Sequence, residues 1–244
     1  MGAASTVLLF FCLASVFVQG ARSATFTFAN KCQEAIYPGV LTNSGKPAFP
    51  TTGFQLQPGA SVNYAVAATW SGRIWARHHC SADASGRFSC QSGDCGTGKV
   101  ECGGAGGQAP STLAEFTLGD QSGKDFYDVS NVDGFNVPLQ IAPSAGSGCT
   151  AVACGADINA ACPAGLAAKA ADGSTVGCKS ACLAFNTDEY CCRGAYGNPD
   201  TCKPSSYSTF FKQKCPQAYS YAYDDKSSTF TCATGASYSI VFCP

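Results

Sequence analysis

The chain has 244 residues, of which 45% are hydrophobic and only 13% are charged. Fifteen basic residues oppose sixteen acidic ones, so the formal net charge is −1, and no Lys or Arg cluster stands out. Nucleic acids and anionic membranes are therefore poor candidate partners, because both are recognised mainly through clustered positive charge.

The first predicted element is a secretory signal peptide over residues 1–23. Residues 7–18, VLLFFCLASVFV, are an apolar run that is too short to cross a bilayer and suits the hydrophobic region of a signal peptide. Small residues at positions 21 and 23 suit cleavage after Ser23. The chain ends at Pro244, directly after Cys243, so we expect no C-terminal sorting extension and a secreted, extracellular protein.

Short stretches with the composition of β-strands occupy much of the remaining chain. Turn signals such as Pro58-Gly59, Asp133-Gly134 and Thr234-Gly235 separate them. Several short strands at this spacing predict a β-sandwich. The predicted strands are residues 25–31, 54–66, 73–77, 113–118, 125–132, 135–141, 219–225, 228–233 and 238–243.

Two segments rich in cysteine interrupt the strand pattern. The first is also rich in glycine and predicts a loop lobe held by disulfides, and the second contains the best helical candidate, residues 180–185. We expect one sandwich with two excursions. The sandwich comprises residues 24–77, 111–155 and 216–244, the small loop lobe residues 78–110, and the helix-containing lobe residues 156–215.

Sixteen of the seventeen cysteines remain once the leader is removed. An even number of cysteines in an oxidising compartment predicts a disulfide framework. Zinc is disfavoured, because there is no C-x-x-C pair and the only histidines, His78 and His79, are adjacent and suit a solvated loop. We therefore expect no metal. Spacing does not give the pairing, but Cys191 and Cys192 must bond to different partners.

Acidic residues concentrate in residues 112–135, which hold one Glu and four Asp against one Lys. If residues 113–118 and 125–130 form a hairpin, symmetric closure places Glu115 opposite Asp128. Like charges at directly opposite positions are destabilising, so the pair is either fully solvated or serves a function such as binding or catalysis.

Each acid also has a plain structural explanation. Glu115 suits the wet face of a strand, Asp133 precedes a turn glycine, and Asp225 suits the end of a strand. Arg73 suits a surface ion pair.

Two neighbouring carboxylates are the minimum for glycoside hydrolysis, in which one is kept protonated and the other ionised. The same groups can instead accept hydrogen bonds from sugar hydroxyls without any reaction. Separation and pKa distinguish these cases, and the sequence supplies neither. The glycine-rich stretch 102–110 lacks the Lys-Ser/Thr ending of a phosphate loop, and we expect no cofactor.

Residues 86–102, GRFSCQSGDCGTGKVEC, resemble the signature of the thaumatin-like, pathogenesis-related group 5 proteins of plants, with Ser92 where the family usually has Thr. TLAEFTL, DFYDVSNVDGFNVP, EYCC, AYSYAYDD and VFCP resemble further family blocks in the same order. The resemblance covers the mature chain, and sixteen cysteines match the long form of the family.

The resemblance implies a mainly β fold: a flattened two-sheet sandwich with a disulfide-rich helical lobe and a small disulfide-stapled loop lobe. It also implies eight disulfides. These are Cys32–Cys243, Cys80–Cys90, Cys95–Cys102, Cys149–Cys232, Cys154–Cys215, Cys162–Cys178, Cys182–Cys191 and Cys192–Cys202.

The resemblance further implies an acidic cleft lined by Arg73, Glu115, Asp128, Asp133 and Asp225, with Asp224 as the one alternative in the alignment. The first function it implies is that of a monomeric antifungal defence protein of the apoplast that binds β-1,3-glucan of fungal walls. The second is a weak endo-β-1,3-glucanase, with Glu115 as the acid and Asp128 or Asp133 as the second carboxylate. A third is a non-catalytic inhibitor of a foreign protein. Some family members are allergens.

Overall fold

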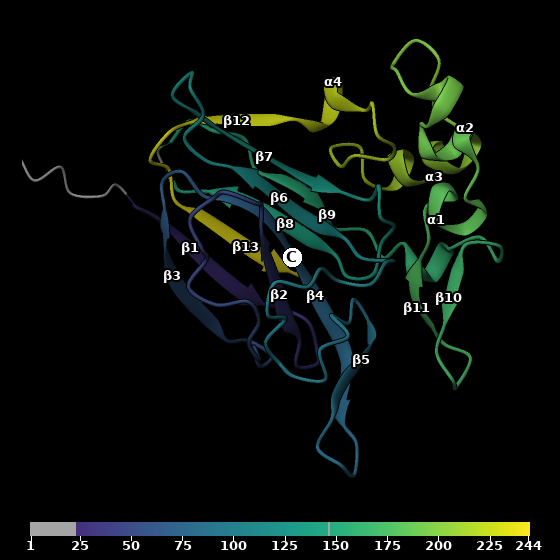
Figure 1. Ribbon diagram of the computed structural model, residues 1–244, viewed down its shortest axis with the longest axis horizontal. Coiled ribbons are helices and arrows are strands. Elements are labelled where there is room, and N and C mark those ends of the chain that lie inside the picture. The colour runs from purple at the N-terminus through teal and green to yellow at the C-terminus, as the bar shows by residue number, and fades with distance from the viewer. Residues whose placement is uncertain (1–22, 146) are drawn as a thin grey trace, which may run out of the picture.

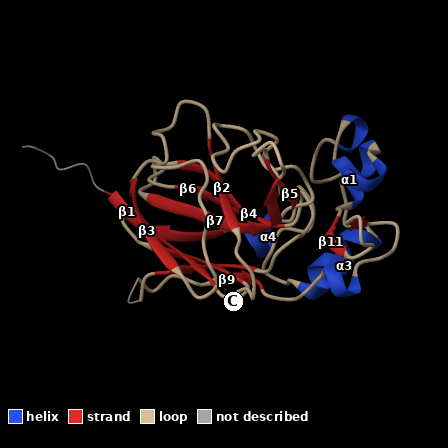
Figure 2. Ribbon diagram, turned by 90° about the horizontal axis from the view of Figure 1, so that it is seen from below, coloured by secondary structure: helices blue, strands red, loops and turns tan. Residues whose placement is uncertain are grey.

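The predicted β-sandwich is confirmed by a computed structural model, which describes residues 23–145 and 147–244 (Figure 1). The predicted signal peptide lies outside these residues except for Ser23. Two sheets pack face to face, and the helices α1–α3 gather at one end of the sandwich (Figures 1 and 2).

The first sheet has five strands in the order β3-β1-β13-β8-β9. β1 and β13 run parallel, so the two ends of the described chain lie side by side in one sheet, whereas the other pairs are antiparallel. Its strands are β1 (Ser23–Asn30), β3 (Ser61–Ala67), β8 (Leu139–Pro143), β9 (Val152–Cys154) and β13 (Tyr238–Phe242).

The second sheet carries the acidic residues. It has five strands in its main path and a sixth strand that extends it. Its order is β12-β7-β6-β4-β2, with β5 paired to the far end of β4. Its strands are β2 (Tyr37–Thr42), β4 (Ser71–Ala82), β5 (Phe88–Ser92), β6 (Leu113–Thr117), β7 (Lys124–Ser130) and β12 (Phe230–Ala233).

The core between the sheets is built from alternate residues of each strand, because successive side chains of a strand point to opposite faces. In β6, Ala114 and Phe116 are buried in the core while Glu115 between them faces outward. Phe26 from the first sheet packs against Phe116 from the second at a ring separation of 4.7 Å. Aromatic contacts of this kind join the two sheets and fix which face of the second sheet remains outside.

The loop lobe covers part of the outer face of the second sheet. Trp75 of β4 and Leu113 of β6 are buried there against the Cys95–Cys102 disulfide. The Trp75 indole Nε1 donates a hydrogen bond of 2.8 Å to the carbonyl oxygen of Gly93. The lobe therefore closes one half of this face and leaves the half beside it open.

The helical lobe contains the predicted helix at residues 180–185, whose start is set by Ser180. The Ser180 hydroxyl accepts a hydrogen bond from the backbone N–H of Leu183, as an N-cap does. The longest helix of the described residues, α3, does not follow from the sequence pattern. The elements of this lobe are α1 (Ala181–Phe185), α2 (Asp188–Cys191), α3 (Ser206–Lys214), the 3-10 helices η1 (Asn159–Ala161) and η2 (Gly194–Tyr196), and the hairpin β10 (Ala167–Lys169) with β11 (Thr175–Cys178).

Sixteen cysteines form eight disulfides in the described residues, and the pairs are those that the resemblance implied. The widest joins Cys32 to Cys243 over a sequence separation of 211 and ties the two ends together. The others are Cys80–Cys90, Cys95–Cys102, Cys149–Cys232, Cys154–Cys215, Cys162–Cys178, Cys182–Cys191 and Cys192–Cys202.

One predicted strand is wrong. Residues 219–225 form turns that lead into the short helix α4 (Asp225–Ser228), and only Tyr219 makes a bridge, with Ser130. The Asp224 carboxylate accepts hydrogen bonds from the backbone N–H and hydroxyl of Ser220, which closes the turn. Among the helices of the described ranges, none has the length and apolarity needed to cross a membrane.

Candidate functional site

Three of the five predicted site residues form one row across the second sheet. In the strand register Arg73 of β4 lies opposite Glu115 of β6, and Glu115 lies opposite Asp128 of β7. The predicted pairing of Glu115 with Asp128 is therefore confirmed. All three side chains are partly buried. Directly opposite residues have Cβ atoms about 4.5–5.5 Å apart, so the ladder alone brings two carboxyl groups and a guanidinium together.

The other two residues reach the same place from loops. Asp133 follows β7 directly, and Asp225 begins α4 on the segment that returns from the helical lobe. Tyr219 holds this segment against the sheet: its backbone N–H donates to the carbonyl of Val129, and its hydroxyl donates to Oδ1 of Asp225 at 2.9 Å. Both Asp133 and Asp225 are exposed, so they form the rim.

The alternative between Asp224 and Asp225 is decided by their contacts. The Asp224 carboxylate lies 2.9 Å from the Lys212 ammonium of α3, in addition to its bonds to Ser220. Its charge is therefore already matched within the protein. Asp225 instead faces the open space above the sheet together with Tyr219.

This space is a cleft of about 500 Å³ that contains all five predicted residues. Its floor is the open half of the second sheet, and its opposite wall is the segment around Tyr219 and Asp225. Aromatic and aliphatic side chains line the same cleft as the charged ones. The cleft is lined by Asn43, Gly72, Arg73, Leu113, Glu115, Phe116, Thr117, Phe126, Asp128, Ser130, Val132, Asp133, Tyr219, Ala222 and Asp225.

Asp128 is the most strongly perturbed acid of the cleft. Burial, followed by the negative charges of Glu115 and Asp225, raises the pKa of Asp128 to about 8. Its Oδ1 atom is also buried without a hydrogen-bond partner among the described residues. At neutral pH this carboxyl group therefore keeps its proton and can act as a hydrogen-bond donor.

Glu115 is held between opposing influences. Burial raises its pKa, Arg73 lowers it, Asp133 raises it, and the Ser130 hydroxyl lowers it. The net effect is a raised pKa for Glu115 as well as for Asp128, but only Glu115 has a cation, Arg73, among the groups acting on it.

Tyr219 is a cleft residue that sequence reasoning missed. Burial is the main cause that raises the pKa of its hydroxyl, and the acids around it add to this effect. The sequence does carry a signal, since YSYAYDD places Tyr219 six residues before Asp225, but the pattern of this segment predicts a strand.

The fold and this groove define a disulfide-stabilised β-sandwich protein with one open, acidic sheet face. Sequence comparison is more specific. The model of the Thaumatin family matches residues 30–244, and the chain belongs to the thaumatin family.

Curated relatives from several plants are similar over nearly their whole length. Thaumatin-like protein 1 of Pyrus pyrifolia is 58% identical over 92% of this chain and 93% of its own. Pathogenesis-related thaumatin-like protein 3.5 of Cryptomeria japonica is 53% identical over 92% of this chain and 91% of its own. A protein of Prunus avium named glucan endo-1,3-beta-glucosidase is 50% identical over 92% of each chain.

Proposed function

We propose that this protein is a secreted, pathogenesis-related defence protein that acts against fungi by binding β-1,3-glucan in the acidic cleft. The observation that carries the proposal is the row Arg73–Glu115–Asp128, which the strand register sets at the floor of an open cleft. Secretion is supported by the predicted leader and by eight disulfides, which persist in oxidising compartments.

The cleft suits a neutral, hydroxyl-rich ligand. Ionised carboxylates are hydrogen-bond acceptors only, whereas a protonated Asp128 and Arg73 supply donors. A sugar hydroxyl is both donor and acceptor and can pair with either kind of group. Aromatic atoms of Phe126 and Tyr219 in the same cleft offer apolar surface for the C–H faces of the rings.

Hydrolysis of the same glucan is the second candidate, and two observations favour it. One relative is named glucan endo-1,3-beta-glucosidase. In addition, Glu115 and Asp128 are neighbouring carboxyl groups of which only Glu115 has a cation acting on it, and a general acid beside a second carboxylate is what hydrolysis requires. The resemblance implies Glu115 as the acid, but the raised pKa of Asp128 and the cation Arg73 beside Glu115 favour Asp128 as the proton donor and Glu115 as the second carboxylate.

A combined sedimentation and digestion assay tests the proposal. Protein would be incubated with insoluble β-1,3-glucan, and bound protein and released oligosaccharides would both be measured. We expect sedimentation of the wild type without product. Glu115→Gln and Asp225→Asn should weaken binding by about tenfold each, because a hydrogen bond to a charged group contributes about 1.5–3 kcal/mol.

Asp200→Asn is the matched control, since Asp200 is an exposed acid of the helical lobe outside the cleft. It should bind as the wild type does. Product from the wild type that disappears in Glu115→Gln and Asp128→Asn would replace the binding function with hydrolysis. Sedimentation that is absent, or equal in all variants, would contradict a glucan site in this cleft and direct attention to protein targets.

A further inference from the structure

His78 and His79 are not a solvated loop, as the sequence suggested, but part of strand β4. Neighbouring residues of a strand normally point to opposite faces. His79 departs from this rule because its backbone φ is +51°, a left-handed value that is uncommon for a bulky residue. As a result both imidazole rings lie on the same side, with centroids 4.4 Å apart.

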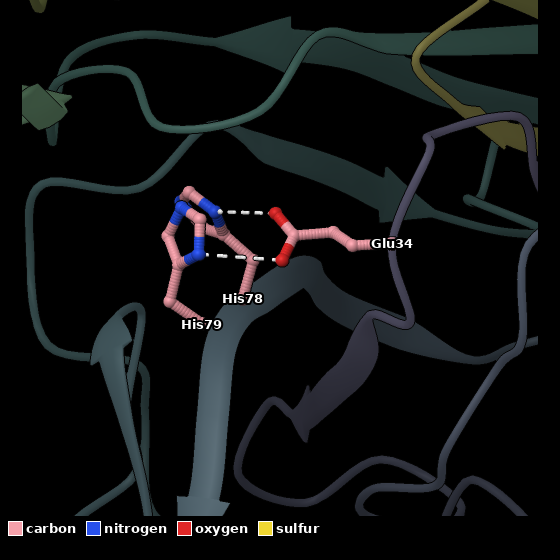
Figure 3. Close-up of side chains that lie close together, drawn as sticks. All are labelled: Glu34, His78 and His79. Carbon is pink, nitrogen blue, oxygen red and sulfur yellow. Dashed lines mark hydrogen bonds and ion pairs between the residues drawn. The ribbon is translucent and has the colours of Figure 1, made fainter.

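Both rings face one carboxylate, that of Glu34 in the loop between β1 and β2 (Figure 3). Nδ1 of His78 lies 3.4 Å from Oε1 of Glu34, and Nδ1 of His79 lies 3.3 Å from Oε2. One ligand atom of each residue lies within 4.8 Å of the others. Two nitrogens and a carboxylate thus converge on one small volume.

The hydrogen bond of His78 determines what its other nitrogen offers. Nε2 lies 3.2 Å from the carbonyl oxygen of Val176 in β11, and a carbonyl can only accept, so Nε2 carries the hydrogen. In the neutral ring, Nδ1 then points a lone pair at the Glu34 carboxylate. Two acceptors that face each other at this distance are stabilised either by a proton on Nδ1, which makes an ion pair with Glu34, or by a metal ion bound between them.

We propose that Glu34, His78 and His79 form a binding site for a divalent transition-metal ion, with Zn²⁺ and Cu²⁺ as the best-suited ions. Imidazole nitrogen and carboxylate oxygen are the ligands that these ions accept. Ligands about 2.1 Å from a tetrahedral ion lie about 3.4 Å apart. Each ring nitrogen lies at about this distance from one Glu34 oxygen, His78 from Oε1 and His79 from Oε2, so the carboxylate can bridge toward an ion held by both rings.

The surroundings hold two of the three ligands, Glu34 and His78, in advance. The Nδ2 amide of buried Asn30 donates to the carbonyl of Glu34 at 2.9 Å, and the Cys32–Cys243 disulfide anchors the same loop. The bond from His78 to the carbonyl of Val176 is the outer contact that metal-binding histidines usually make, and it fixes the ring orientation.

The site is also accessible. The side chains of Glu34 and His79 are 44% and 43% exposed, whereas that of His78 is 9% exposed. All three line a second cavity of about 500 Å³, separate from the acidic cleft, whose other charged lining residues are Lys31 and Asp157. A water molecule from this cavity can complete a four-coordinate site with three protein ligands.

Isothermal titration of the purified, EDTA-treated, disulfide-bonded protein with ZnCl₂ tests the proposal. We expect one ion per chain. Glu34→Gln and His79→Asn should each lower the affinity by at least about tenfold, and Asn keeps the left-handed backbone at position 79. Bound Cu²⁺ should show two coupled nitrogens by electron paramagnetic resonance in the wild type and one in His79→Asn.

Glu115→Gln separates this site from the acidic cleft and should leave Zn²⁺ binding unchanged. Loss of Zn²⁺ binding in Glu115→Gln, with retention in Glu34→Gln and His79→Asn, would assign the ion to the cleft and overturn the proposal. Failure of the wild type to bind Zn²⁺ or Cu²⁺ one to one would also overturn it, because the rings and Glu34 would then be paired through a proton alone.

Discussion

Asp125 and Asp128 are three residues apart on β7, yet the pleat of the strand gives them opposite environments. Asp125 points inward, where its carboxylate accepts hydrogen bonds from the hydroxyl of Tyr238 at 2.8 Å and the backbone N–H of Gly119 at 2.9 Å. Asp128 points into the cleft, where one of its oxygens has no partner among the described residues. One acid stabilises the core and the other is available to a ligand.

The raised pKa of Asp128 predicts a dependence of stability on pH. An unfolded Asp has a pKa of about 4 and the folded one about 8, so the folded state holds an extra proton between these values. The free energy of unfolding therefore falls as the pH rises through this window. In Asp128→Asn the side chain cannot ionise. The free energy of unfolding of this variant should therefore fall by about 1–3 kcal/mol less than that of the wild type between pH 5 and pH 8.

Guanidinium unfolding at both pH values, with the disulfides intact, measures this difference. Asp200→Asn, which removes an exposed acid, should follow the wild type. If Asp128→Asn also followed the wild type, Asp128 would already be ionised in the folded protein, and it could not donate a proton to a glucan.

Individual strands could be predicted where local pattern and fold agree. The hairpin of β6 and β7 was predicted with its register, because alternating residues and a short polar loop leave few ways to close it. Strand β2 was missed because Pro38-Gly39 resembles a turn. Pro38 is tolerated because β2 is an edge strand of the sheet, and Gly39 is needed because a Cβ there would lie 2.5 Å from the Trp75 ring.

Because of the Trp75 indole, we expect alanine substitutions at two neighbouring glycines of the loop lobe to have opposite effects on stability. A Cβ on Gly107 would lie 2.4 Å from Nε1 of Trp75, whereas a Cβ on Gly106 would meet no atom closer than 3.6 Å. Neither residue has a left-handed φ. Gly107→Ala should therefore destabilise the protein by about 1–3 kcal/mol, because the lobe must move off the sheet. Gly106→Ala should be neutral or stabilise it by up to about 1 kcal/mol.

Thermal unfolding of both variants, followed by tryptophan fluorescence, checks this pair. Equal melting temperatures would mean that the loop lobe adapts to Trp75 rather than packing rigidly against it.

At the scale of the whole molecule, both proposed sites depend on segments that the fold brings together from distant parts of the sequence. Arg73 and Asp225 line one cleft, and His78 contacts both Glu34 and Val176 only because β4, β11 and the loop after β1 converge. Spacing in the sequence could not predict these contacts. The resemblance to a family implied the residues of the acidic cleft, but nothing in the sequence indicated that the His79 ring would lie beside that of His78.

The Cys32–Cys243 disulfide is the whole-molecule constraint with the largest expected effect on stability. It spans 211 residues, and roughly 110 remain in its loop after the bridges nested within it are subtracted. Closing a loop of about 100 residues stabilises the folded state by about 4.7 kcal/mol in the chain-entropy model, against about 3 kcal/mol or less for a loop of about 15 residues or fewer.

Replacing both cysteines of Cys32–Cys243 by serine should therefore lower the free energy of unfolding by about 2 kcal/mol more than the same change at Cys80–Cys90, which spans only 10 residues. All four cysteines are partly buried, so the loss of packing is similar in the two variants. Guanidinium midpoints give the comparison. Equal costs would show that the denatured chain keeps its ends together without the bridge. A greater cost at Cys32–Cys243, accompanied by weaker Zn²⁺ binding, would show that the bridge also holds the loop of Glu34 in place.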